Sequence, residues 1–285
     1  MRFVACCGAT ITALALICTA TAASQRDLND CEASDPDLSI AGCTRILQGE
    51  DESTNERFAA YVNRGNARLA KGDLDRAFAD YNEAIWLNPL DFVVYRQLGT
   101  ARFAKGDLDR AIADLNEAIR LIPKYPEPGQ LPAIVSTYMV RGLVNLYDRQ
   151  LPKALADLNK VSELVPKYLY GALWLDIVEK RSNLASRLPE TIAQLDMTKW
   201  PAPVIRLFLG QTTPESVLTA ADDSDMNTKE GQVCEANFYS AELALQKGAK
   251  DDAIRLFQLA VENCPKNYLE FFAASTELKA VGRVQ

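Results

Sequence analysis

Apolar and small side chains recur along much of this chain at three- and four-residue spacing, which is the spacing of one face of a helix. Over residues 58–91, two such runs are separated by a short turn that contains Gly72 and Asp73. Gly72 can take the left-handed conformation that ends a helix, and Asp73 can accept a backbone N–H at the start of the next one. Pro89 ends the second run because its ring clashes with a continuing helix. The pattern predicts a hairpin of two helices.

The hairpin pattern is repeated. Residues 67–89 and 101–123 lie 34 positions apart and differ at only five of their 23 positions. A third copy is displaced by nine residues and follows a Pro/Gly-rich stretch at 124–134, and a fourth occupies 234–267. A repeat of this length predicts hairpins that stack on one another. The recurring positions are Gly65, Ala77, Tyr81, Ala84 and Pro89; Gly99, Ala111, Leu115, Ala118 and Pro123; Gly142, Ala154, Leu158, Val161 and Pro166; and Ala241, Ala253, Phe257, Ala260 and Pro265.

These offsets resemble the tetratricopeptide repeat (TPR). The resemblance implies an all-α fold, a TPR-type helical-hairpin superhelix (α-solenoid) with a C-terminal capping helix. In the region before the last repeat the pattern is helical but irregular, with expected helices at 172–187, 190–196, 204–209 and 214–221. The expected organisation is a signal peptide (1–23), a degenerate half-repeat (24–55), three hairpins (58–168), an irregular helical linker region (169–232), a C-terminal repeat (234–267) and a capping helix (268–285).

The first 23 residues predict a secretory signal peptide. They carry one arginine, an apolar run at 11–17 and a small-residue end, with cleavage expected after Ala22 or Ala23. The apolar run is shorter than the roughly 20 residues of a membrane span. Cys18 follows Ile17 instead of a small residue, so lipidation is not expected. We therefore expect a periplasmic or secreted protein with no integral membrane segment after cleavage.

Four cysteines remain after cleavage, and four cysteines allow three disulfide pairings. The hairpin geometry selects one pairing, because antiparallel helices place the start of one beside the end of the next. Cys234 is expected to open the first helix of the last repeat and Cys264 to end the second, while Cys31 and Cys43 face each other in the half-repeat. We expect disulfides Cys31–Cys43 and Cys234–Cys264. The alternative, a zinc site, lacks any CxxC spacing.

Composition excludes several kinds of chemistry. The formal net charge is −7, and −8 once Arg2 leaves with the signal peptide, which argues against a nucleic-acid partner. The chain has no histidine, so no catalytic triad is expected, and its glycines form no phosphate loop. The acidic pair Asp73/Asp75 is interpreted as helix capping, and residues 222–225 as a solvated loop instead of a calcium site. We expect no catalytic, cofactor or metal site. The alternative is a carboxylate-dependent hydrolase, which a cleft with two convergent buried carboxylates would favour.

The concave face of a TPR array is formed by the first helix of each repeat, and the resemblance implies that peptides bind there. The alternative is that several of these residues, Phe103 and Leu143 above all, pack against the next repeat. Lysine, asparagine and arginine grip a C-terminal carboxylate in the chaperone adaptors of this family, but here only Asn66 is kept. The candidate peptide-binding residues are Val62, Asn66, Leu69, Arg96, Thr100, Phe103, Met139, Leu143 and Tyr147.

Residues 234–278 resemble the last repeat and cap of a bacterial outer-membrane TPR lipoprotein. That family acts as an adaptor that brings cell-wall hydrolases to a periplasmic tail-specific protease, and it dimerises through its N-terminal region. The resemblance implies protein or peptide partners and makes a homodimer one partner to consider. This chain departs from the family because it lacks the lipid-attachment cysteine. The sequence predicts an exported TPR scaffold without catalysis, and more specifically an adaptor in envelope proteolysis or peptidoglycan-hydrolase turnover.

Overall fold

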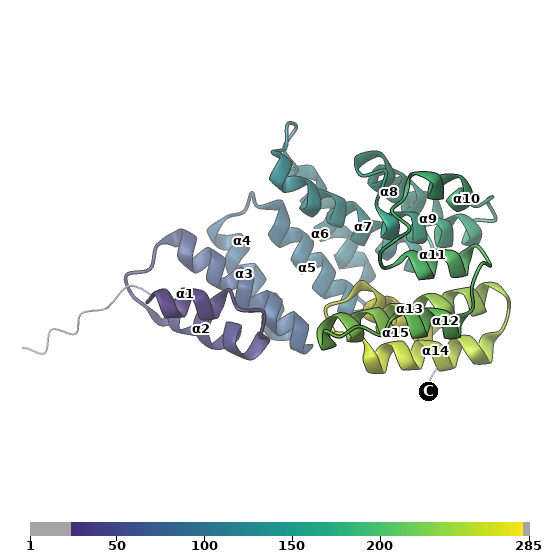
Figure 1. Ribbon diagram of the computed structural model, residues 1–285. Helices are drawn as coiled ribbons and strands as arrows, with labels where there is room; N and C mark the ends of the chain where they lie inside the picture. Colours follow the sequence, from purple (N-terminus) through teal and green to yellow (C-terminus); the bar gives the residue numbers. More distant parts are fainter. Residues whose placement is uncertain (1–23, 282–285) are drawn as a thin grey trace, which may run out of the picture.

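The computed structural model describes residues 24–281, which form an all-helical array of stacked hairpins (Figure 1). The α-helices of this part of the chain are α1 (Gln25–Cys31), α2 (Pro36–Gln48), α3 (Thr54–Lys71), α4 (Leu74–Leu87), α5 (Phe92–Lys105), α6 (Leu108–Leu121), α7 (Leu131–Tyr147), α8 (Leu151–Leu164), α9 (Leu169–Arg181), α10 (Leu188–Thr191), α11 (Ala202–Phe208), α12 (Pro214–Ala220), α13 (Met226–Gln246), α14 (Lys250–Asn263) and α15 (Leu269–Val281). Two short 3₁₀ helices, η1 (Pro128–Gln130) and η2 (Ile192–Gln194), complete them. The expected signal peptide lies outside the described residues.

The successive hairpins α1/α2, α3/α4, α5/α6 and α7/α8 stack side by side, and α9 continues the stack (Figure 1). The hairpin α13/α14 forms the last repeat, and α15 packs on α14 and α13. The all-α superhelix that the repeats predict is therefore the observed fold. α7 begins at Leu131, inside the Pro/Gly-rich stretch at 124–134 that is expected to precede the third hairpin as an insert.

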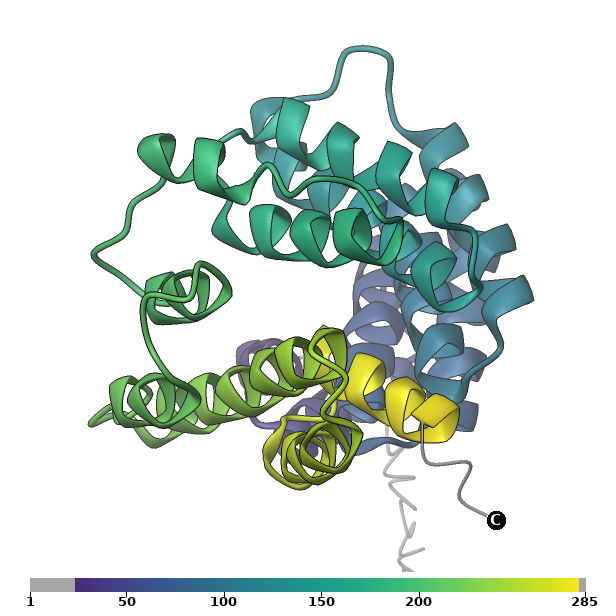
Figure 2. The ribbon, with the colours of Figure 1, turned by 90° about the vertical axis from the view of Figure 1, so that its right-hand side faces the viewer.

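The array curves so strongly that its C-terminal part returns to its own inner face (Figure 2). α15 contacts α7 as well as α13 and α14. The ring centroids of Phe103 in α5 and Phe272 in α15 are 6.0 Å apart. At the turn between α3 and α4, a Cβ placed on Gly72 would lie 3.4 Å from Cδ of Lys266, which follows α14. The helix expected to cap the end of the stack therefore also packs inside the curve.

Small residues in the repeats allow close helix packing. A Cβ on Gly65 would lie only 2.6 Å from a ring carbon of Tyr81, so the glycine makes room for the buried tyrosine of the same hairpin. Gly72 and Gly248 end their helices with φ values of 76° and 77°, in the left-handed conformation expected of a turn glycine. These two features connect the repeated sequence directly to the hairpin geometry.

Two local expectations differ from the structure. Asp73 stands at the N-terminus of α4, but its side chain makes no capping hydrogen bond and instead lies 3.3 Å from the Arg76 guanidinium. Cys234 does not open its helix, because α13 begins at Met226, where the Asp225 side chain accepts the Thr228 N–H. The acidic segment expected to be a loop thus supplies the cap that lengthens this helix.

The irregular region contains shorter helices than the pattern predicts. α9 ends at Arg181, and Asn183 adopts a left-handed φ of 56°, which breaks the helix expected to continue to residue 187. A new helix, α10, then begins with Pro189 in its first turn and is followed by η2. The expected helix at 190–196 is therefore divided into two short pieces, whereas α11 and α12 lie close to their expected positions.

The structure contains both expected disulfides, Cys31–Cys43 and Cys234–Cys264. The first joins α1 to α2, where a small apolar cluster around Ile46 and Ala60 is separate from the main core. The second joins α13 to the end of α14. Across residues 24–281, every helix is too short or too polar to cross a bilayer.

Candidate functional site

The residues expected to bind a peptide lie on α3, α5 and α7, along the inner side of the array. Five of the nine are buried, with exposed fractions of 5% for Leu69, 7% for Thr100, 1% for Phe103, 3% for Met139 and 0% for Leu143. Val62, Asn66, Arg96 and Tyr147 are partly buried. In this conformation most of the inner face is therefore covered by protein.

The C-terminal helix covers much of this face. Phe103 stacks on Tyr147 with ring centroids 5.8 Å apart and meets Phe272 of α15 edge-on. The Tyr147 hydroxyl is buried without a hydrogen-bond partner, and burial raises the pKa of this tyrosine well above its usual range. The packing partner of Phe103 therefore includes a helix from the far end of the chain, in addition to the neighbouring repeat that the sequence suggests.

A partly buried arginine holds the returning segment in place. Arg181, at the end of α9, lies 2.6 Å from Glu242 Oε2 of α13 and 2.6 Å from Glu277 Oε1 of α15. Its guanidinium carbon is also 5.9 Å from the centroid of the Tyr147 ring. Glu242 is fully buried, and its burial raises the pKa to about 7 even though Arg181 lowers it. One cation thus links the three helices that close the curve.

Polar residues on α3 and α5, at the other end of the inner face, form hydrogen bonds with other residues of the array. The Asn66 side chain accepts a hydrogen bond from the Tyr81 hydroxyl at 2.9 Å. The Thr100 hydroxyl donates to the Arg96 carbonyl at 2.9 Å. The guanidinium of Arg96 donates to Gln97 at 3.2 Å, and burial lowers the pKa of Arg96. Whether any of the nine residues binds a peptide stays a prediction.

Sequence reasoning missed an ion pair that recurs between the two helices of the hairpins α3/α4, α5/α6 and α7/α8. Asp80 is 2% exposed and is held by Arg64 at 2.8 Å and Arg68 at 2.6 Å. Asp114 and Asp157 occupy the same repeat position, and they pair with Arg102 at 3.0 Å and Arg141 at 2.6 Å. The sequence signal that could have predicted these ion pairs is an aspartate directly before the large apolar residue of each of these repeats, namely Tyr81, Leu115 and Leu158. These pairs fix hairpin geometry and do not form a ligand site.

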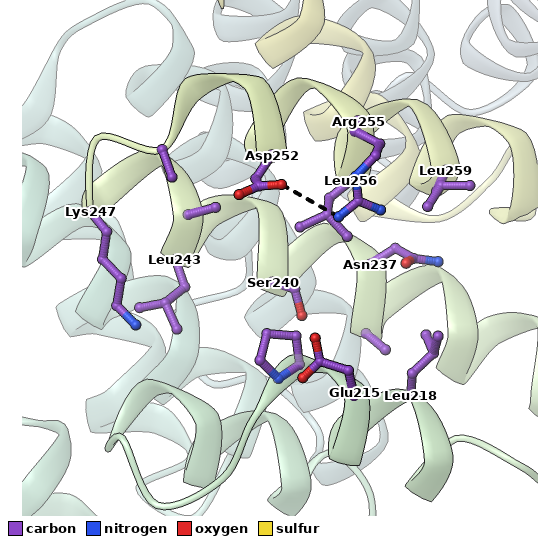
Figure 3. Close-up of a pocket in the computed structure, with 14 residues that line it drawn as sticks. Glu215, Leu218, Asn237, Ser240, Leu243, Lys247, Asp252, Arg255, Leu256 and Leu259 are labelled. Carbon is purple, nitrogen blue, oxygen red and sulfur yellow. Dashed lines mark ion pairs between the residues drawn. The ribbon is translucent and has the colours of Figure 1, made fainter.

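An open groove lies on the C-terminal repeat, between α12 and α14 with α13 as its floor (Figure 3). Its volume is about 420 Å³. The floor carries Asn237 and Ser240, both largely buried, while Leu218 and Leu256 supply apolar walls. Charges of both signs stand around it: Glu215, Lys247, Asp252 and Arg255. Because α12 has only seven residues, it covers just part of the α13 face.

Two further buried carboxylates lie on α13 and α15. Tyr170 and Trp200 donate hydrogen bonds to Glu235, from the hydroxyl at 2.9 Å and the indole N–H at 2.6 Å. The Tyr239 hydroxyl donates to Glu270 Oε1 at 3.0 Å. Burial first, and the Glu270 charge second, raise the pKa of Glu235 to about 8. Burial also raises the pKa of Glu270. The sequence signal was a pair of glutamates inside otherwise apolar helical stretches.

A metal centre has no obvious place in the structure. Among residues 24–281, no three histidine, cysteine, aspartate or glutamate side chains converge in a way that could hold a metal ion. The segment Asp222–Asp225 is engaged otherwise, since Asp222 pairs with Lys229 at 2.6 Å and Asp225 caps α13. The four cysteines that a zinc site would need form the two disulfides.

Comparison with known proteins agrees with the repeat architecture. A family model of the tetratricopeptide repeat matches residues 62–126 and 233–268, which contain α3–α6 and α13–α14. The match supports tetratricopeptide repeats in these two segments, which together make up about a third of the chain.

Solved structures that match part of this arrangement include several TPR proteins. YrrB, described as a TPR protein with an unusual peptide-binding site, is 16% identical with a TM-score of 0.43, over 83% of this chain and 98% of that one. TTC0263, a thermophilic TPR protein of Thermus thermophilus, is 17% identical with a TM-score of 0.42, over 80% and 100% of the two chains. The P58(IPK) TPR domain is 13% identical with a TM-score of 0.29, over 91% and 98%. At these values no residue role is transferred from them.

Proposed function

We propose that this protein is a scaffold that binds other proteins or peptides and has no catalytic activity. Glu235 and Glu270 are the convergent buried pair that would favour a hydrolase, but burial raises the pKa of both, and such an enzyme needs one carboxylate ionised as base or nucleophile. The observation that carries the proposal is the groove over α13 in the C-terminal repeat (Figure 3). α15 packs on α7 inside the curve of the array, whereas this groove is open. Its apolar walls and partly hydrogen-bonding floor suit a peptide segment, because such sites combine apolar burial with a few placed polar groups.

The groove can contact a peptide in two ways. Ser240 projects from the floor, where its hydroxyl can both donate to and accept from a peptide backbone. Lys247 and Arg255 lie around the groove with Glu215 and Asp252, so charged side chains of either sign can be paired there. We expect orientation and specificity to come from these charges, and affinity from the apolar walls.

Site-specific photocrosslinking in cells tests this proposal. A photoreactive residue is placed at Leu218 or Lys247, beside the groove, and at Trp86 on the distant α4 as the control. We expect the same partner to be captured from both groove positions and not from Trp86. A second variant, Ser240→Arg, fills the groove and should abolish that capture. Identical products from all three positions would contradict the proposal.

We further propose that the protein acts in an oxidising compartment outside the cytoplasm. The two disulfides support this location, since disulfides persist in the periplasm and in secreted proteins. The first 23 residues have the composition of a signal peptide. Mass spectrometry of the protein from fractionated cells should find an N-terminus near Ser24 and no free thiols. A retained leader and alkylatable cysteines would contradict the location.

The finer role rests on the resemblance of residues 234–278 to the TPR lipoprotein that serves a tail-specific protease. On that basis we propose an adaptor in envelope proteolysis or peptidoglycan-hydrolase turnover. Deletion of the gene should raise the level of at least one cell-wall hydrolase, measured by quantitative proteomics, and a copy carrying Ser240→Arg should not restore it. Unchanged hydrolase levels would reject this role while leaving a general scaffold intact.

A further inference from the structure

A second, smaller cavity lies where α9 faces α13 and the start of α15. Its volume is about 270 Å³. Glu235 and Glu270 line it together with four aromatic side chains: Tyr168, Tyr170, Trp174 and Tyr268. The two carboxylates and Trp174 are buried, whereas the three tyrosines are partly exposed. The cavity therefore has an acidic, aromatic interior and an entrance formed by tyrosines.

The two carboxylates of this cavity have no cationic partner among residues 24–281. Their exposed fractions are 7% for Glu235 and 6% for Glu270, and the donors that reach them are neutral: two tyrosine hydroxyls and the Trp200 indole. The nearby Glu242 and Glu277 differ, since both are paired with Arg181. Burying a carboxylate without a cation is unfavourable, so this arrangement leaves room for a positive charge.

The aromatic walls favour an organic cation over a metal ion. The ring centroids of Tyr168 and Tyr170 are 5.9 Å apart, and both rings are partly exposed. Trp174 also lines the cavity, but it is buried and packs against Phe238 and Tyr239. Aromatic faces attract ammonium groups, while hard metal ions are coordinated by oxygen ligands and water and are not favoured by aromatic walls. An anion would be repelled by the glutamates. The chemistry of the lining thus selects a cation with an apolar stem.

We propose that this cavity binds the primary ammonium group of a lysine side chain from a bound protein or peptide, which rests on the scaffold function proposed above. The three N–H donors of the ammonium match the carboxylates of Glu235 and Glu270, and a tyrosine hydroxyl can accept the third. The aliphatic stem of the lysine lies among the aromatic side chains. The cavity is thereby a specificity site that reads one basic residue of the partner.

The proposal predicts that binding strengthens as pH rises from 6 to 9. Burial holds part of the carboxylate pair protonated, with the pKa of Glu235 at about 8, and a cation requires the ionised form. The other titratable groups that face the pair are Tyr168 and Tyr170 on α9, Tyr239 on α13 and Tyr268 before α15. These phenols stay protonated over that range because burial raises the pKa of each.

NMR titration of the purified ¹⁵N-labelled protein tests the proposal. The chain has three tryptophans, and the Trp200 indole N–H donates directly to Glu235, so its signal reports on the cavity. The probe is N-acetyl-lysine methylamide, and the neutral control probe is N-acetyl-norleucine methylamide. We expect saturable shifts of the Trp200 signal with the lysine probe alone, and an affinity at least tenfold higher at pH 9 than at pH 6.

Matched variants separate the cavity from general electrostatics. The double variant Glu235→Gln/Glu270→Gln should weaken binding of the lysine probe at least tenfold. Glu242→Gln changes a buried glutamate of the same helix whose partner is Arg181, and it should leave the affinity within about twofold. No saturable shift, equal shifts with both probes, or full binding by the double variant would overturn the proposal. None of these outcomes affects the crosslinking test at the groove, so the two proposals fail separately.

Discussion

The rings of Phe103 and Phe272 meet edge-to-face at 6.0 Å and join the second repeat to the last helix of the chain. This contact helps to close the curve of the array, since α5 and α15 are far apart in sequence and meet through these two rings. The return of the C-terminal part to the inner face is visible in Figure 2. It also explains why the inner face offers little open surface. The first prediction concerns this pair.

Phe272→Ala should destabilise the protein by about 3–5 kcal/mol, because it removes a buried ring and leaves a cavity beside Phe103. Trp86→Ala is the control: this tryptophan is 79% exposed, and its loss should cost less than about 0.5 kcal/mol. Urea denaturation followed by circular dichroism measures both. Equal small effects would mean that α15 does not rest on the inner face.

Arg181→Met should destabilise the protein by about 3–5 kcal/mol, because Glu242 and Glu277 would stay buried without a cation. Further replacement of both glutamates by glutamine should restore part of the loss. Arg255→Met is the matched control, since its pair with Asp252 is exposed and 3.6 Å long, and it should change stability by about 0–1 kcal/mol. Thermal unfolding compares the three variants. No recovery in the triple variant would refute the explanation by unpaired charge.

Gly65→Ala should destabilise the α3/α4 hairpin by about 1–3 kcal/mol, because the new methyl group would lie 2.6 Å from the Tyr81 ring. Gly129→Ala has nothing within 4 Å of the new carbon and should be nearly neutral. Chemical denaturation compares the two. If both variants unfold at the wild-type midpoint, the close approach of α3 to α4 is wrong.

Stability should fall as pH rises from about 4.5 to about 8, through the contribution of Glu235. Its pKa is raised by burial from an ordinary 4.5 to about 8, so in this window the folded state binds a proton that the unfolded state has lost. The stabilisation from this bound proton is complete below pH 4.5 and is lost as the pH rises through about 8. Glu235→Gln should flatten this dependence of the midpoint of thermal unfolding, whereas exposed Glu262→Gln should leave the slope unchanged. An identical slope in Glu235→Gln would assign the effect elsewhere.

Removal of the Cys234–Cys264 disulfide by a double serine substitution should cost about 3–4 kcal/mol, from the loop-closure entropy of a 30-residue separation. The 12-residue separation of Cys31–Cys43 gives about 3 kcal/mol in the same treatment. Because α1 and α2 belong to an apolar cluster separate from the main core, loss of Cys31–Cys43 should increase hydrogen exchange in α1 and α2 alone. Hydrogen exchange resolved by mass spectrometry distinguishes the loss of Cys31–Cys43 from the loss of Cys234–Cys264. Global exposure after loss of the N-terminal bridge would contradict a separate cluster.

Local order could be predicted from the sequence because each hairpin is specified by its own residues. The small Gly65, the buried Tyr81 and the left-handed Gly72 act within one repeat, so their pattern predicts their geometry. The cysteine pairs also join neighbouring helices and follow from hairpin geometry. The buried Asp80 was missed although it recurs, because an aspartate on a helix reads as solvent-facing until its arginine partner is placed.

The sequence by itself determined the class of fold and the pairing of the cysteines. Only the tertiary structure decided what lies inside the curve, because small rotations between successive hairpins accumulate along the array and no single repeat encodes their sum. That sum places α15 on the inner face, gives Arg181 two acidic partners and brings Glu235 and Glu270 to one cavity. The acidic cavity and the Arg181 contacts therefore arise between segments distant in sequence, where a local pattern carries no signal.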